Sequence, residues 1–66
     1  MTLYKYIKTH PLPDRQVRNF IAAVCDLDAA TIKFWQKNPK KIEPKYYAEI
    51  EKATLGHVTV DELANK

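Results

Sequence analysis

The chain has 66 residues, 45% of them apolar and seven of them aromatic, with one glycine and one cysteine. At this length only about 60% of the unfolded surface can be buried, so one small core must support a single domain spanning residues 1–66. The shortage of glycine disfavours hairpins and sandwiches and favours a compact all-α fold. Cys25 has no partner for a disulfide and no CxxC motif for zinc, which favours a reduced, cytoplasmic setting.

The formal net charge of +3 is unevenly distributed along the chain. Residues 1–41 carry eight Lys or Arg against three Asp or Glu, whereas residues 42–66 carry three against five. The basic first part predicts a polyanionic partner, and the acidic remainder is expected to face elsewhere. Neither a secretory leader pattern nor a run of about eighteen apolar residues occurs, so we expect no secretion and no membrane partner.

The first two predicted helices flank the segment HPLP at residues 10–13. Thr2 is expected to cap the first helix, whose apolar side chains are spaced at i, i+3 and i+4, and Pro11 disfavours helix at the preceding residue. Asp14 is expected to cap the second helix. An apolar stripe at i, i+3, i+4 and i+7 defines the core face of that helix: Val17, Phe20, Ile21 and Val24.

The third predicted helix follows after three or four residues, which is a helix-turn-helix spacing. Asp28 is expected to accept hydrogen bonds from the first exposed amides, and the helix should run from Ala29 to about Asn38, where Pro39 stops it. Leu27 and Ile32 are spaced as a hydrophobic staple around this cap.

Two further helices are predicted in the acidic part. Pro44 suits a first helical position, and Gly56 is expected to end that fourth helix in a left-handed conformation. The segment TVDE from Thr59 to Glu62 is a capping box that opens a short fifth helix. We therefore expect five short helices in one all-α domain.

The second and third predicted helices resemble the helix-turn-helix of the lambda-repressor-like DNA-binding domains, in particular the Cro and YdaS-type regulators of phages and prophages. The small, turn and anchor positions of that motif are filled by Ala22, Asp26, Leu27, Ile32 and Trp35. Asp26 replaces the usual turn glycine and can adopt a left-handed conformation at a small cost. The cap is Asp28, where the family more often has Ser or Thr.

The resemblance continues beyond the two helices, over roughly residues 16–63. Family members often read VSxW, a basic loop and then IPxxxxxxIExATGGxVTxxEL, and this chain reads TIKFWQKNPKKIEPKYYAEIEKATLGHVTVDEL. Leu55 stands between Thr54 and Gly56, where the family tends to have adjacent glycines. Outside the motif, the matching positions are Ile42, Pro44, Ile50, Glu51, Ala53, Thr54, Gly56, Val58, Thr59, Glu62 and Leu63.

The resemblance implies which side chains would meet DNA. Phe34 and Trp35 are adjacent and should point in different directions: Trp35 into the core, with a contact surface as its alternative, and Phe34 outward, with packing on the fourth helix as its alternative. The expected base-contacting residues are Asp28, Ala29, Ala30, Lys33, Phe34 and Lys37. The expected phosphate-contacting residues are Arg15, Gln16, Arg18, Lys40, Lys41 and Lys45, each of which could instead be a solvated surface group.

No catalytic, metal or cofactor site is predicted. The chain has no serine and one glycine, which leaves no Ser-His-Asp triad and no phosphate-binding loop, and His10 and His57 lie far apart in sequence. Cys25 is expected to be a small core residue rather than a redox switch.

We therefore expect a non-enzymatic, Cro-like repressor in a bacterial cytoplasm, acting as a homodimer on a pseudo-palindromic double-stranded operator, without a small-molecule ligand. An antitoxin or excisionase-type protein with this domain, or a protein-interaction module without DNA binding, is the alternative.

Overall fold

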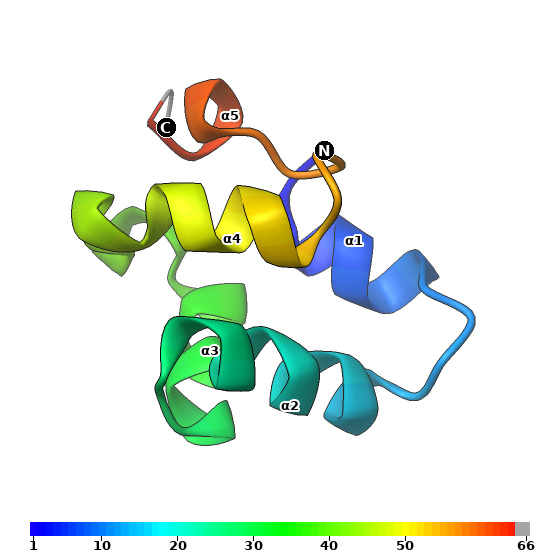
Figure 1. The fold of residues 1–66 in the computed structure, drawn as a ribbon. Coiled ribbons are helices and arrows are strands. Elements are labelled where there is room, and N and C mark those ends of the chain that lie inside the picture. The colour runs from blue at the N-terminus through cyan, green and yellow to red at the C-terminus, as the bar shows by residue number, and fades with distance from the viewer. Residues whose placement is uncertain (65–66) are drawn as a thin grey trace.

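The computed structural model describes residues 1–64 and, over that range, contains helices and no strand. In chain order the elements are α1 (Leu3–Thr9), α2 (Asp14–Cys25), α3 (Ala29–Lys37), the 3₁₀ turns η1 (Pro39–Lys41) and η2 (Pro44–Tyr46), α4 (Tyr47–Ala53) and α5 (Val60–Ala64). The all-α prediction is confirmed. Figure 1 shows α4 lying across α2, with α5 on the far side of α4.

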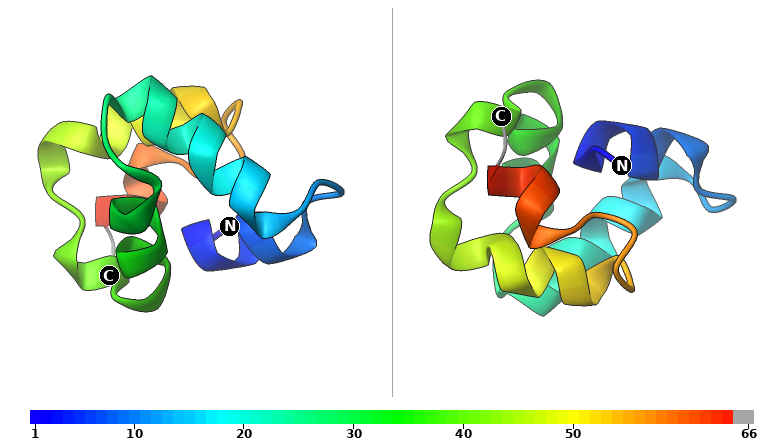
Figure 2. Two further views of the ribbon diagram at one scale, coloured as in Figure 1. Left: turned by 90° about the horizontal axis from the view of Figure 1, so that it is seen from below. Right: turned by 90° about the horizontal axis from the view of Figure 1, so that it is seen from above.

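The core is a single cluster of aliphatic side chains contributed by every α-helix and by the connections between them. Its fully buried members are at most 2% exposed: Ile7, Ile21, Ile32, Ile42, Ile50 and Val58. Figure 2 shows α1 and α3 next to one another on the side of α2 that faces away from the viewer of Figure 1. Three short helices therefore pack around α2, which is the longest helix at 12 residues.

Local sequence signals explain the starts of α1 and α5. The Thr2 side chain accepts a hydrogen bond from the Lys5 amide at 3.1 Å, as predicted for the cap of α1. The predicted capping box is also present, because Thr59 Oγ1 accepts from the Glu62 amide and Glu62 Oε1 accepts from the Thr59 amide, both at 3.1 Å.

Two predicted caps are wrong. Pro13 occupies the cap position of α2, and Asp14 is instead the first helical residue, where its carboxylate pairs with Lys8 at 2.8 Å. Asp28 occupies the cap position of α3, but its side chain accepts no capping hydrogen bond. In its place the Asp28 backbone carbonyl accepts from the Thr31 amide at 3.0 Å. Asp28 therefore starts α3 through its extended backbone alone.

The predicted core face of α2 is partly wrong. Val17, Ile21, Ala22 and Cys25 are buried, whereas Phe20 is 59% exposed. Ala22 and Cys25 have small side chains, which allow neighbouring helices to approach on their side of α2. The buried residues of α2 therefore lie on a different side of the helix from Phe20.

Helices α2 and α4 end with the same backbone turn. After α2, the Leu27 amide donates to the Ala22 carbonyl at 2.8 Å and the Asp26 amide donates to Ala23 at 3.3 Å, and Asp26 is left-handed with φ 58°. This pair of hydrogen bonds is a Schellman motif. The left-handed conformation predicted for Asp26 is confirmed.

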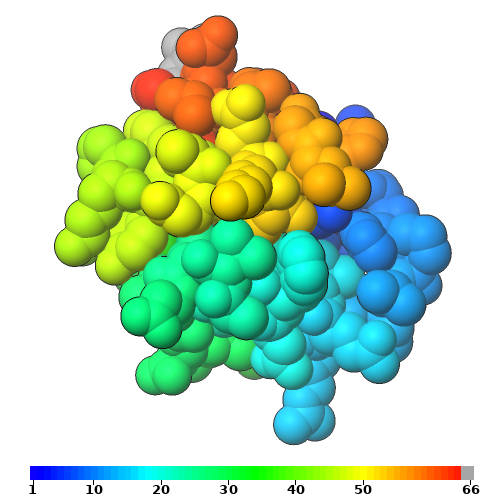
Figure 3. Space-filling model, in the orientation of Figure 1, coloured from blue at the N-terminus to red at the C-terminus, as the bar shows by residue number. Residues whose placement is uncertain are grey.

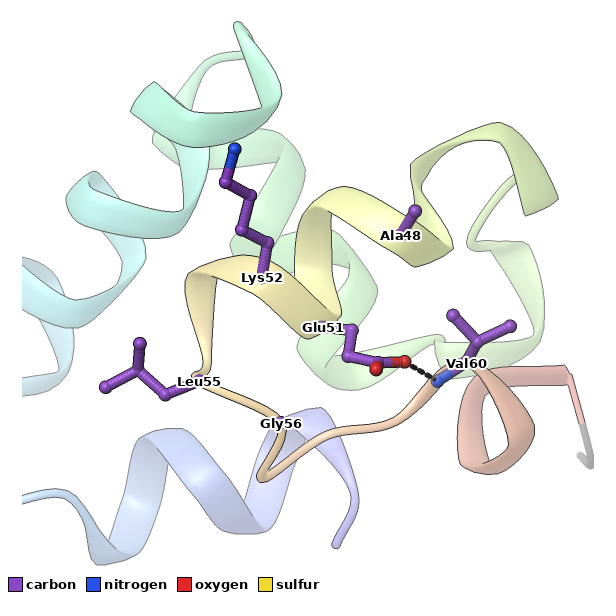
Figure 4. A pocket seen from close by; sticks show the side chains of 6 residues that line it. All are labelled: Ala48, Glu51, Lys52, Leu55, Gly56 and Val60. Carbon is purple, nitrogen blue, oxygen red and sulfur yellow. Dashed lines mark hydrogen bonds between the residues drawn. The ribbon is translucent and has the colours of Figure 1, made fainter.

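The corresponding turn after α4 has its left-handed residue one position earlier than predicted. The Gly56 amide donates to Glu51 at 2.9 Å, the Leu55 amide donates to Lys52 at 3.2 Å, and Leu55 itself has φ 54°. Gly56 follows, also with a positive φ of 82°. Figure 4 shows the Leu55 side chain pointing away from the hydrogen bond that joins Glu51 to the Val60 amide at 2.8 Å.

Thr54 fixes the connection from α4 to α5. Its side chain is fully buried, and its Oγ1 accepts from the Val58 amide at 3.1 Å while donating to the Ile50 carbonyl at 2.9 Å. Val58 and Leu63 are both buried beside it, as expected for the hydrophobic staple of α5.

Candidate nucleic-acid interface

Helix α3 has one buried face and one exposed face. Ile32, Trp35 and Gln36 are buried, and the exposed side chains on the opposite face are Ala30, Lys33, Phe34 and Lys37. This division follows from the 100° that separates consecutive residues of an α-helix. We call these four exposed residues the outer face of α3.

The adjacent rings of Phe34 and Trp35 point in different directions. Trp35 is 4% exposed and contacts the Tyr46 ring, with the ring centroids 5.3 Å apart. Phe34 is 50% exposed. Trp35 therefore belongs to the core, whereas half of the Phe34 side chain is open to solvent.

The start of α3 offers fewer exposed groups than its middle. Ala29 is half-buried and packs against the core, while Asp28 is exposed. Because the Asp28 carboxylate makes no capping bond, it remains available at the edge of the outer face. Among the predicted base-contacting residues, Ala29 is thus the least accessible.

The predicted phosphate-contacting residues on α2 point to two sides of that helix. Arg18 is half-buried, and its Nη1 donates to Oε1 of Gln36 on α3 at 3.4 Å. Arg15 is exposed and lies one turn before Arg18, on a similar side. Gln16 is also exposed but lines a groove beside Phe20. Arg18 therefore contacts α3, Arg15 lies on a neighbouring side of α2, and Gln16 lies on a different side.

The contact between Arg18 and Gln36 was not predicted from sequence. Gln36 is only 7% exposed, although a glutamine is usually found on a surface. Its neighbour Trp35 was the recognised anchor, and no spacing in the sequence indicates that an arginine 18 positions earlier would reach it. The contact links α2 to the buried face of α3.

The three later lysines differ in their surroundings. Lys40 and Lys41 are exposed in η1, a helical turn rather than the loop expected from sequence, and η1 follows directly on α3 through Asn38. Lys45 lies 3.4 Å from the Glu43 carboxylate and 5.2 Å from the centre of the Tyr46 ring. The Tyr46 hydroxyl, and then Glu43, raise the pKa of Lys45 above its ordinary value. Lys45 is therefore cationic, and the nearby Glu43 carboxylate offsets part of its charge.

Cys25 lies in the core, at 7% exposure. Burial, and then the nearby Glu49 carboxylate, raise the pKa of its thiol to about 11. The side chain is therefore a neutral thiol at physiological pH, which suits packing and opposes nucleophilic or redox chemistry.

His10 and His57 approach one another in space, which sequence separation did not indicate. Both rings flank Tyr6, with centroid distances of 5.4 Å and 6.0 Å. Nδ1 of His10 accepts a hydrogen bond from the Leu12 amide at 3.1 Å. Within residues 1–64, no group of three or more metal-binding side chains occurs.

Comparison with known proteins adds no relative. No protein-family model matches the chain, and neither the curated proteins nor the solved structures contain a match. In the part of the chain that the structure describes, no helix has the length and apolar character needed to cross a membrane.

Proposed function

We propose that the chain is a double-stranded DNA-binding transcriptional regulator that reads the major groove with the outer face of α3. One observation carries the proposal: from residue 29 to residue 42 the chain has four lysines and no carboxylate, and all four lysines are exposed. Phe34 is exposed among them. A basic surface with an apolar centre suits a polyanion whose groove floor presents methyl groups.

The outer face has the dimensions and chemistry for base contacts. An α-helix with its side chains is about 10 to 12 Å in diameter, which fits a major groove about 12 Å wide. Ala30 and Phe34 can contact thymine methyl groups, and Lys33 and Lys37 can donate to guanine O6 and N7. At the edge, the Asp28 carboxylate can accept from a cytosine amino group.

Cations beside the outer face would contact the phosphates. Lys40 and Lys41 follow α3 and would lie along one strand of the DNA backbone. Arg15 and Arg18 would approach the phosphates from α2. Arg18 would have two roles: its Nη1 donates to Gln36, and its other guanidinium nitrogens would donate to a phosphate. These contacts would supply affinity and set the register without reading sequence.

The proposed biological role is repression. Two copies related by a two-fold axis would place their α3 helices in successive major grooves, about 34 Å apart, and would block polymerase sterically on a pseudo-palindromic operator. The Asp26 turn between α2 and α3 supports a helix-turn-helix, as does the resemblance to Cro and YdaS-type regulators in the cytoplasm of a bacterial host.

Selection of bound duplexes from a random pool, followed by a salt titration of the best duplex, tests the proposal. We expect enrichment of two inverted half-sites and a log–log salt slope of about −4 to −7 for a pair of chains. A pool without enrichment, together with no duplex binding at about 50 mM salt, would contradict it.

A further inference from the structure

A groove lies between α1, the first half of α2 and the end of α4, on a different part of the surface from the outer face of α3. It has a volume of about 290 Å³. Figure 3 shows the face on which these three segments meet. Its apolar lining consists of Tyr6, Leu12, Val17, Phe20, Ala53 and Leu55.

Three of these apolar side chains have at least half of their surface exposed to solvent. Phe20 is 59%, Leu12 50% and Leu55 85% exposed. Leu55 also has a positive φ, which glycine adopts without strain and leucine does not. The Leu55 side chain is almost fully exposed and so buries little apolar surface in this fold, although its backbone is strained, which points to a contact made with another molecule.

The charge around the groove indicates which molecule. No carboxylate, ammonium or guanidinium group lines it, and its polar lining consists of Gln16 and His10. The chain as a whole carries a net charge of +3, and its outer face of α3 is basic. Two copies would repel each other at that basic face, whereas the residues that line the groove carry no charge that would repel a second copy.

We propose that the groove is a self-association surface, in which Leu55 of each copy enters the groove of the other around a two-fold axis. A two-fold contact requires one patch to be complementary to itself, and here a protruding side chain and a hollow lie on the same patch. The two exposed rings of Phe20 would be covered in the same contact.

This inference rests on the proposed function for its biological meaning, because it supplies the pairing surface that an operator-bound dimer needs. No residue of α3 lines the groove, so groove-to-groove pairing leaves both outer faces of α3 uncovered. The eight lining residues are fewer than the 20 to 30 per partner of a standard interface, so we expect a weak dimer.

Sedimentation equilibrium without DNA, between about 10 µM and 1 mM chain, tests the proposal over the concentrations at which a weak dimer forms. We expect the wild-type chain to dimerise, and Leu55→Gly and Phe20→Ala each to weaken dimerisation roughly tenfold or more. Leu55→Gly removes the backbone strain, so its melting temperature should not fall. Loss of the dimer then cannot be attributed to unfolding.

Matched controls exist within the chain. Asp26→Gly relieves the same left-handed strain in the turn after α2, and Phe34→Ala removes an equally exposed ring from the outer face of α3. Both should dimerise like the wild type. A chain that stays monomeric at about 1 mM would overturn the proposal and leave the groove for a different protein. Equal weakening by Phe20→Ala and Phe34→Ala would overturn it too.

The same variants separate this inference from the proposed function. Monomeric Leu55→Gly should still bind a single half-site duplex at low salt, with the two-site affinity reduced. If the wild type dimerises through the groove and binds no duplex, the proposed function fails and the self-association stands. If it binds duplex but never dimerises through the groove, the reverse holds.

Discussion

The two faces of α3 use one aromatic residue each, for opposite purposes. Trp35 is buried against Tyr46 and holds the helix to the domain, whereas Phe34 is half-exposed among lysines and holds nothing. The Phe34 ring is exposed on the same side of the helix as Lys33 and Lys37. The comparison teaches that the stability supplied by Trp35 and the recognition proposed for Phe34 can be tested separately.

The largest effect should come from the inner face. Trp35→Ala removes a buried ring and leaves a cavity, which we expect to lower the free energy of unfolding by about 3 to 5 kcal/mol. For a domain of this size that is most of the stability available. Urea denaturation followed by circular dichroism measures it. A loss below about 1 kcal/mol would show that Trp35 does not anchor α3.

The matching change on the outer face should leave folding intact. Phe34→Ala is expected to shift the free energy of unfolding by less than about 0.5 kcal/mol, because half of the ring is already in water. On DNA it should relax preference at one base step by about 1 to 3 kcal/mol. Competition between duplexes that differ at single positions measures this. An unchanged ranking of duplexes would remove Phe34 from base recognition.

A smaller effect on all duplexes alike is expected from the phosphate contacts. Lys41→Ala should weaken every duplex similarly and reduce the salt slope by about 1 per chain. Lys45→Ala is the control, because its amine already pairs with Glu43 and should release less counterion. Salt titrations of duplex binding by both variants measure the two salt slopes. If Lys45→Ala has the larger effect, the DNA backbone runs nearer η2 than we propose.

The smallest effect concerns surface charge and folding. The hydrogen bond from Lys8 holds the pKa of Asp14 below its ordinary value of 3.8. A lowered folded-state pKa means stability that is present above pH 3.8 and lost as the pH falls through the lower folded value. Asp14→Asn should therefore flatten the acid limb of a melting-temperature profile slightly and leave neutral pH almost unchanged. A large drop at pH 7 would contradict this.

The order of the helices could be predicted because their signals are local. Thr2, the capping box at Thr59 and the positive φ of Asp26 each depend on residues within one turn. The separation of Trp35 from Phe34 follows from helical periodicity, which also identified the exposed lysines of α3.

The parts that could not be predicted depend on how helices meet. Phe20 fits the apolar period of α2, but α1 and α4 leave a groove beside it. No local sequence pattern predicts that groove. The contact of Arg18 with Gln36 requires the packing of α2 on α3 to be known. Leu55 was missed because the glycine beside it is the usual left-handed residue.

The buried hydroxyl of Thr54 has a consequence for motion. The Val58 amide donates to this side chain, which is 0% exposed, although Val58 itself lies in the connection between α4 and α5. An amide in such a connection would ordinarily exchange its hydrogen with water quickly, through local fluctuations. Here exchange requires the hydroxyl to leave the core, so the Val58 amide should be as strongly protected as those of α4. We therefore expect slowly exchanging amides on both sides of the segment that carries Leu55.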